Sequence, residues 1–190
     1  MESETTLPFI RYTRRNFLSS GMIAAMGFLF PVIPKTWGAV PLPLERRLRF
    51  YNTHTGERLD VRYWRNGGYS DEALKSVNHF FRDFRTGGIK EIDVRLLDLL
   101  HNISEKAPDN HSIHLISGYR SPETNRMLRS KGSGVALKSL HMIGQAADIR
   151  IPGVQTTSVR NIAVNIGQGG VGYYPKSDFV HVDIGSVRCW

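Results

Sequence analysis

The feature that most constrains the fold is the order in which strand patterns and helix patterns follow one another. Residues 48–53 and 57–64 alternate as strands do, and the turn residues at 54–56 favour a hairpin between them. Apolar residues at helical spacing predict helices afterwards, and short apolar strands dominate the last part of the chain. The expected helices are 70–84, 93–104, 121–129 and 157–166, and the expected later strands are 113–117, 146–151, 171–174 and 179–184. This order predicts an α+β domain in which helices pack on a small antiparallel sheet.

The net charge excludes few classes of binding partner. The chain of 190 residues has a formal charge of +8, and residues 1–38 hold four basic against two acidic side chains. Basic domains can bind nucleic acid, membrane surfaces or anionic polymers such as a cell wall. The basic residues are scattered and form no long run, so we expect no nucleic-acid partner.

The N-terminal segment has the layout of an export signal. Arg14 and Arg15 precede an uncharged run from Phe17 to Ile33, and the whole resembles a twin-arginine signal. A membrane anchor is the alternative, but about 17 residues is short for a span and glycines and prolines interrupt the run. We expect residues 1–38 to be this signal, with cleavage after Gly38 or Ala39, and a periplasmic or envelope location. Membrane contact is then expected only through an uncleaved signal.

Residues 39–47 read as a linker and residues 48–190 as one domain. Cys189 is the only cysteine, so an intramolecular disulfide is impossible and no cysteine ends the signal for lipid attachment. The domain must therefore be stable through its core or a metal. No heptad pattern or large apolar patch is evident, and a monomer is expected.

Two of the seven histidines stand out as candidates for chemistry. His141 lies in the stretch SLHMIGQAAD, whose small residues allow close approach of the backbone and whose Asp148 opens a strand. His181 lies on a strand between apolar residues, where an imidazole needs a partner. Two histidines and one carboxylate on rigid elements suit zinc with a fourth, open position. The alternative is that His141 is a satisfied core histidine and Asp148 a cap, and the spacing alone leaves both open.

Several separated motifs resemble one family. The pattern Ser139-x-His141-x-x-Gly144-x-Ala146-x-Asp148, followed by a strand histidine, is similar to the zinc D-Ala-D-Ala peptidases, whose fold also occurs in hedgehog domains and lysostaphin-type endopeptidases. The segments 117–125, 172–175 and 179–190 resemble more closely the subgroup of murein endopeptidase K. The likeness covers residues 48–190 and implies the zinc peptidase fold.

The resemblance also implies roles for particular residues. His141, Asp148 and His181 would bind Zn²⁺, which polarises the scissile carbonyl and lowers the pKa of its bound water toward ~7. Arg120 would bind a substrate carboxylate or stabilise an oxyanion, with a structural ion pair as the alternative. The implied substrate is peptidoglycan (murein), with hydrolysis of the cross-links between its stem peptides.

The general base is where the sequence departs from the family pattern. The dipeptidase members of the family that the chain resembles have a glutamate three residues before the last histidine ligand, and this chain has the shorter carboxylate of Asp178 there. Asp183 is the rival, because residues two apart on a strand face the same side. Asp178 would face the site only if the chain is still turning after Ser177. Family spacing favours Asp178 as the base, with Asp183 or neither of the two as the alternatives, and the one that is not the base is expected to orient a histidine.

Two other functions remain open on the sequence. One is a D,D-carboxypeptidase or dipeptidase that trims stem ends. The other is a non-catalytic wall-binding module with structural zinc, because a shared fold does not guarantee activity. The cross-link could join D-alanine to diaminopimelate or diaminopimelate to diaminopimelate.

Overall fold

The computed structural model describes residues 45–108, 112–132 and 134–190 of the chain. The expected export signal in residues 1–38 lies outside this part. Among the described helices, none has both the length and the apolar character needed to cross a bilayer.

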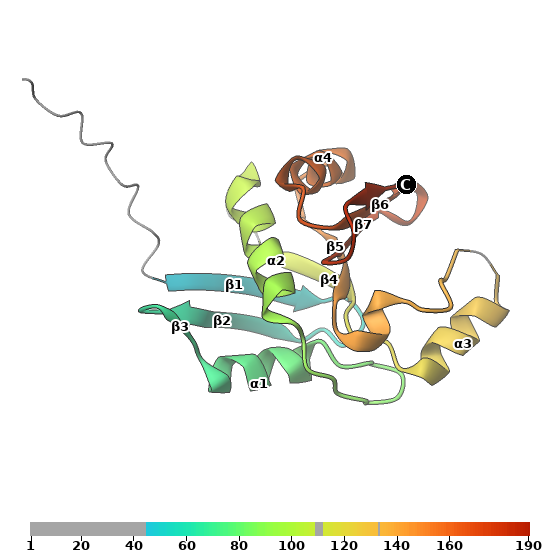
Figure 1. Cartoon of the computed structure of the whole chain (residues 1–190), viewed down its shortest axis with the longest axis horizontal. Helices are drawn as coiled ribbons and strands as arrows, with labels where there is room; N and C mark the ends of the chain where they lie inside the picture. Colours follow the sequence, from blue (N-terminus) through green and yellow to red (C-terminus); the bar gives the residue numbers. More distant parts are fainter. Residues whose placement is uncertain (1–44, 109–111, 133) are drawn as a thin grey trace, which may run out of the picture. The chain divides into compact units, whose positions relative to one another are not determined.

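The described residues form one eight-stranded sheet with four α-helices (Figure 1). The strands are β1 (Glu45–Asn52), β2 (Arg58–Arg65), β3 (Gly68–Tyr69), β4 (Ile113–Ser117), β5 (Ala146–Arg150), β6 (Gly170–Tyr174), β7 (Phe179–Asp183) and β8 (Arg188–Cys189). The helices are α1 (Asp71–Phe80), α2 (Val94–Lys106), α3 (Pro122–Ser130) and α4 (Thr156–Ile166), with short 3₁₀ helices η2 (Leu140–Ile143) and η3 (Pro175–Ser177).

The sheet is mixed, with the strand order β3-β2-β1-β4-β5-β7-β6-β8. The α+β class and the β1–β2 hairpin are confirmed. Most neighbouring strands pair antiparallel, as expected, but β1 pairs parallel with β4 and β6 pairs parallel with β8. The connection from β1 to β4 runs through β2, β3, α1 and α2. A crossover of that length brings the chain back in the same direction, which a tight hairpin does not do.

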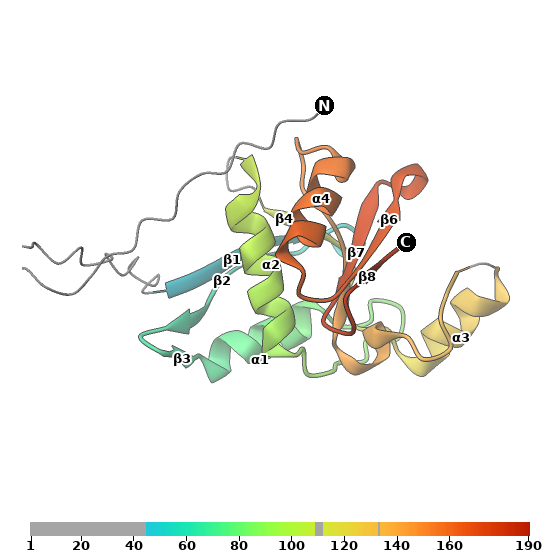
Figure 2. The same cartoon turned by 45° about the horizontal axis from the view of Figure 1, so that its top comes forward.

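One apolar core fills the space between the sheet and helices α1, α2 and α4. Helix α1 packs on β2, α2 on β1, and α4 on β6 and β7. Figure 2 shows α2 and α4 side by side over the sheet, whereas α3 lies beyond the end of the sheet. The largest fully buried core side chains come from both layers: Phe50, Leu48, Tyr63, Ile113, Leu115, Ile149, Ile151, Phe81, Leu96, Leu97, Leu100 and Ile103.

Strand alternation separates this core from the polar side chains of β5 and β7. Val180 and Val182 are fully buried in the core, so His181 between them points to the opposite face of the sheet. Asp148 is the register partner of His181 on β5, and paired residues share a face. The pleat therefore places an imidazole and a carboxylate side by side on the face away from the helices.

Helix α1 ends at Phe80, earlier than the predicted end near residue 84. The Asp83 carboxylate accepts hydrogen bonds from the backbone N–H groups of Arg85 and Ser121, which draws this segment out of helical geometry. The Phe84 ring instead stacks on His54, with 3.9 Å between ring centroids. The segment after α1 is thus fixed by a side chain that the helical pattern does not reveal.

Candidate metal centre

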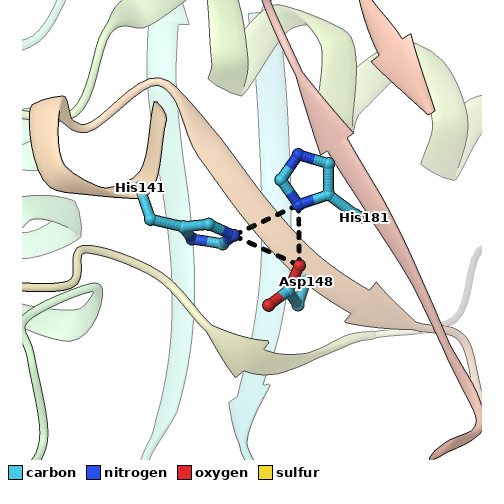
Figure 3. Close-up of side chains that lie close together, drawn as sticks. All are labelled: His141, Asp148 and His181. Carbon is cyan, nitrogen blue, oxygen red and sulfur yellow. Dashed lines mark hydrogen bonds and ion pairs between the residues drawn. The ribbon is translucent and has the colours of Figure 1, made fainter. Parts of the chain in front are cut away.

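Three donor atoms from three elements converge on one point (Figure 3). His141 comes from η2, Asp148 from β5 and His181 from β7. His141 Nε2 lies 3.2 Å from Asp148 Oδ1 and 3.2 Å from His181 Nδ1, and His181 Nδ1 lies 2.9 Å from Asp148 Oδ1. Two nitrogens and one carboxylate oxygen on rigid elements match the donor set of a catalytic zinc site.

The other ring nitrogen of each histidine is already used. His141 Nδ1 donates to the carbonyl oxygen of Gly118 at 2.7 Å, and His181 Nε2 donates to Asp183 Oδ2 at 3.0 Å. These bonds keep a proton on the outer nitrogen of each ring, so His141 Nε2 and His181 Nδ1 are the atoms that can give up a proton to bind a cation beside Asp148. Outer partners of this kind are typical of histidines that bind a metal. The residues present therefore fit a divalent cation at this point.

The charges at the centre keep the carboxylates ionised. Burial alone would raise the pKa of Asp148, but the charges and hydrogen bonds of His141 and His181 outweigh burial and lower it. Burial lowers the pKa of His181, yet its bonds to Asp148 and Asp183 raise it to about 9. A cation would thus compete with a proton for His181 Nδ1, as is usual for histidine ligands.

The short spacing between His141 and Asp148 depends on Gly144. The chain leaves η2 through Gly144, which adopts the left-handed conformation with φ of 71°, and then enters β5. A side chain there would collide with the backbone carbonyl of Glu91, and the Gly144 carbonyl accepts a bond from the N–H of Asp93 at 3.0 Å. The inference that small residues here allow close approach of the backbone is confirmed.

Replacing Gly144 with alanine is expected to lower the free energy of unfolding by about 3 kcal/mol. Left-handed strain contributes about 1 kcal/mol and the collision with Glu91 about 2 kcal/mol. Gly167 is a matched control, since its φ is 67° and an added Cβ meets only the Val164 carbonyl at 4.0 Å. Urea unfolding should give about 1 kcal/mol for Gly167→Ala. Equal losses in the two variants would contradict the collision.

Arg120 lies against the centre on the segment after β4. Its Nη2 donates to Asp148 Oδ2 at 3.3 Å, and its side chain is only 11% exposed. Within the described part of the chain, its buried Nε has no hydrogen-bond partner. Arg120 also lines the cavity beside the centre, so a guanidinium that binds the Asp148 carboxylate with one edge can present its other N–H groups to a substrate oxygen there. An ion pair of Arg120 with Asp148 is therefore compatible with a second contact of Arg120 to a substrate.

The segment that carries Arg120 is held by groups that the sequence reasoning missed. The buried Asp83 accepts the N–H of Ser121, and the N–H of Tyr119 binds the Phe81 carbonyl. Gly118 packs so closely on Phe81 that an added Cβ would lie 2.6 Å from the Phe81 carbonyl oxygen. The motif Ser117–Ser121 marked this segment, but the role of the Gly118 carbonyl as a partner of His141 has no signal in sequence.

The two candidate bases occupy different environments. The Asp183 side chain is fully buried behind His181 and also accepts the N–H groups of Gly170 and Gly185. Asp178 follows η3 in the left-handed conformation, and its carboxylate binds Arg150 and Thr156 with 60% of the side chain exposed. The structure thus brings His141, Asp148, His181, Arg120 and Asp183 together, and it does not bring Asp178 to them.

A cavity of about 260 Å³ opens beside the three donor atoms. His141, Asp148 and His181 all line it, so a bound cation would be reachable by a substrate. Much of the remaining lining is cationic or aromatic: Arg120, Lys138, Arg188, Tyr174, Phe179 and Trp190. An open side next to three ligands agrees with a catalytic site, whereas structural zinc sites are closed by a fourth protein ligand.

Comparison with known proteins places the chain in a family. The family described as peptidoglycan L,D-endopeptidase MepK matches residues 42–190. The protein named peptidoglycan L,D-endopeptidase MepK of Escherichia coli (strain K12) is 41% identical over 177 residues, which cover 93% of this chain and 96% of the relative. The protein of the same name from Shigella flexneri has the same identity and coverage. The chain therefore belongs to the MepK family of M15 metallopeptidases, as the resemblance of its motifs had indicated.

Proposed function

We propose that this chain hydrolyses L,D peptide cross-links between peptidoglycan stem peptides, with Zn²⁺ held by His141, Asp148 and His181. The observation that carries the proposal is the convergence of three donor atoms at the wall of an open cavity. The relatives named L,D-endopeptidases supply the substrate class. In the bond between two diaminopimelate residues, the carboxyl group comes from an L-centre, so this cross-link is the L,D bond. In the bond from D-alanine to diaminopimelate, the carboxyl group comes from a D-centre.

Zinc would supply a Lewis acid for the scissile carbonyl and a water molecule of lowered pKa. The chain's own residues then bind and orient the reactants. Arg120, which contacts Asp148 Oδ2 and lines the cavity, is placed to donate N–H groups to a substrate carboxylate or to the oxygen that gains charge. Its burial strengthens such a bond, because little water competes for the guanidinium.

The contacts of Asp183 indicate that it orients the His181 ring. Its carboxylate fixes the His181 ring from behind, and its four partners leave it fully buried. We propose that it holds the tautomer in which Nδ1 faces the metal. The assignment of Asp178 as general base stays a prediction, with its carboxylate bound to Arg150 and Thr156.

We also propose that the protein works in the periplasm after export by the twin-arginine signal in residues 1–38. A route that carries folded proteins suits a domain that binds its metal before export. The basic composition favours the carboxylate-rich wall polymer as a partner.

The test is digestion of purified sacculi by the zinc-loaded full-length protein, with the released muropeptides identified by mass spectrometry and His141→Ala as control. Loss of L,D-cross-linked dimers with a matching gain of monomers, absent in the control, is the expected result. Loss of D,D-cross-linked dimers alone would overturn the bond assignment. Shortened stems with intact dimers would indicate a carboxypeptidase. Unchanged sacculi with about one zinc per chain would indicate a binding module.

A further inference from the structure

Trp190 is a large aromatic residue at the metal centre that the proposed chemistry does not use. Its backbone continues the β6–β8 pairing, since its N–H binds the Val171 carbonyl at 3.2 Å and its carbonyl accepts the N–H of Tyr173 at 2.9 Å. Its indole centroid lies 5.4 Å from that of the His181 imidazole, and the ring lines the cavity. Even so, 52% of the residue is exposed.

The indole is fixed by two further contacts. Its Nε1–H donates to the Tyr174 hydroxyl at 3.0 Å, and the Arg188 guanidinium lies 5.0 Å from the ring centroid. Arg188 is in turn bound to Asp183 at 2.7 Å. These contacts restrain the Trp190 side chain to one rotamer before any ligand arrives. Binding then costs little side-chain entropy, which favours tight contact between the indole and a ligand.

The strand next to Trp190 makes room for it with a glycine. Gly172 is the register partner of His181 on β6. A Cβ at this position would lie 2.8 Å from two carbon atoms of the Trp190 ring and 2.9 Å from Tyr174. The glycine therefore lets the indole lie directly beside a metal ligand, where a substrate bond would have to be placed.

We propose that Trp190, held by Tyr174 over Gly172, is a specificity-determining residue that packs on the aliphatic part of a stem peptide beside the scissile bond. This inference rests on the proposed hydrolysis of peptidoglycan cross-links. The alkyl chain of a diamino acid offers an apolar surface between polar ends. The cavity offers a matching arrangement, with an aromatic wall from Trp190 and Tyr174 near the cations Arg120 and Lys138. The aromatic wall selects the alkyl chain, and the cations donate hydrogen bonds to the carboxylate of the diamino acid.

The experiment compares zinc-loaded full-length wild type with Trp190→Ala, Tyr174→Phe and Gly172→Ala. Steady-state cleavage of an L,D-cross-linked muropeptide gives KM and kcat, and calorimetry gives the affinity for the uncross-linked stem peptide. Trp190→Ala is expected to raise KM and weaken peptide binding about tenfold with little change in kcat or zinc content. Gly172→Ala should reproduce this by displacing the indole, and Tyr174→Phe should shift KM in the same direction by less. Val187→Ala is the matched control, because Val187 is 70% exposed near β8 and does not line the cavity.

Each outcome decides between substrate contact and support of the metal centre. Unchanged KM and peptide affinity in Trp190→Ala would overturn the inference, as would a fall in kcat that parallels a loss of zinc. If wild type binds the stem peptide but cleaves nothing, the hydrolysis proposal fails. Weakened peptide binding by Trp190→Ala would then still support the contact.

Discussion

Replacing His141 or His181 with alanine is expected to abolish zinc binding and turnover together. Each variant removes one of three donors, and the two that remain cannot complete a stable zinc site. The Lewis acid contributes several kcal/mol of transition-state stabilisation, so turnover should fall about 10³-fold or more. Zinc measured by mass spectrometry on dialysed protein and cleavage of a cross-linked muropeptide give the two readouts.

His79→Ala is the matched control for these variants. His79 is exposed on α1, and its imidazole forms no hydrogen bond with any other residue that the structure describes. It should keep about one zinc per chain and full turnover. Circular dichroism checks folding in all three variants, because His141 also holds the Gly118 carbonyl. A folded His141→Ala that retains zinc and activity would refute the metal centre, and one that loses zinc but still cleaves would refute metal-dependent hydrolysis.

Local patterns sufficed for the parts of the fold that depend on nearby residues. The apolar neighbours of His181 predicted its strand, and the alternation of Val180 and Val182 set the face on which the imidazole lies. The run of small residues before Asp148 predicted a close backbone approach, which Gly144 makes against Glu91. These signals depend on strand pleat and side-chain volume, which are readable over a few residues.

Long-range pairing was not predictable in the same way. The parallel contact of β1 with β4 joins Phe50 to Ile113 across two helices, and no local pattern encodes that choice. The early end of α1 has a similar cause, since Asp83 binds the distant N–H of Ser121. Trp190 also lay within a recognised motif, yet its place beside His181 follows from the long-range β6–β8 pairing and from its contacts with Tyr174 and Arg188.

The general base was left open because spacing does not fix the direction of a side chain. The sequence required the chain to be still turning after Ser177 if Asp178 was to face the site. The chain does turn there, through η3 and the left-handed Asp178, but the carboxylate binds Arg150 and Thr156. Asp183 does share the face of His181, as the strand period predicts, and it lies behind the ring.

Asp183→Asn is expected to weaken zinc binding about 10- to 100-fold, whereas Asp178→Asn should leave zinc affinity unchanged. Asparagine keeps the shape of Asp183 but loses the charge that holds the His181 Nε2–H, so Nδ1 is presented to the metal less firmly. Titration against a competing chelator gives the zinc affinity, and kcat at saturating zinc isolates the chemical step. An orienting Asp183 predicts that most of kcat returns when zinc is saturating.

The same pair of variants separates the orienting role from the two base assignments. If Asp183 is the base, Asp183→Asn keeps its zinc affinity and kcat falls about 10²- to 10⁴-fold at saturating zinc. If Asp178 is the base, that loss appears in Asp178→Asn instead. Urea unfolding must accompany the titration, because Asp183 also binds the N–H groups of Gly170 and Gly185. A stable Asp183→Asn with reduced zinc affinity and recoverable kcat identifies a positioning residue, since neither a base nor a purely structural carboxylate gives that combination.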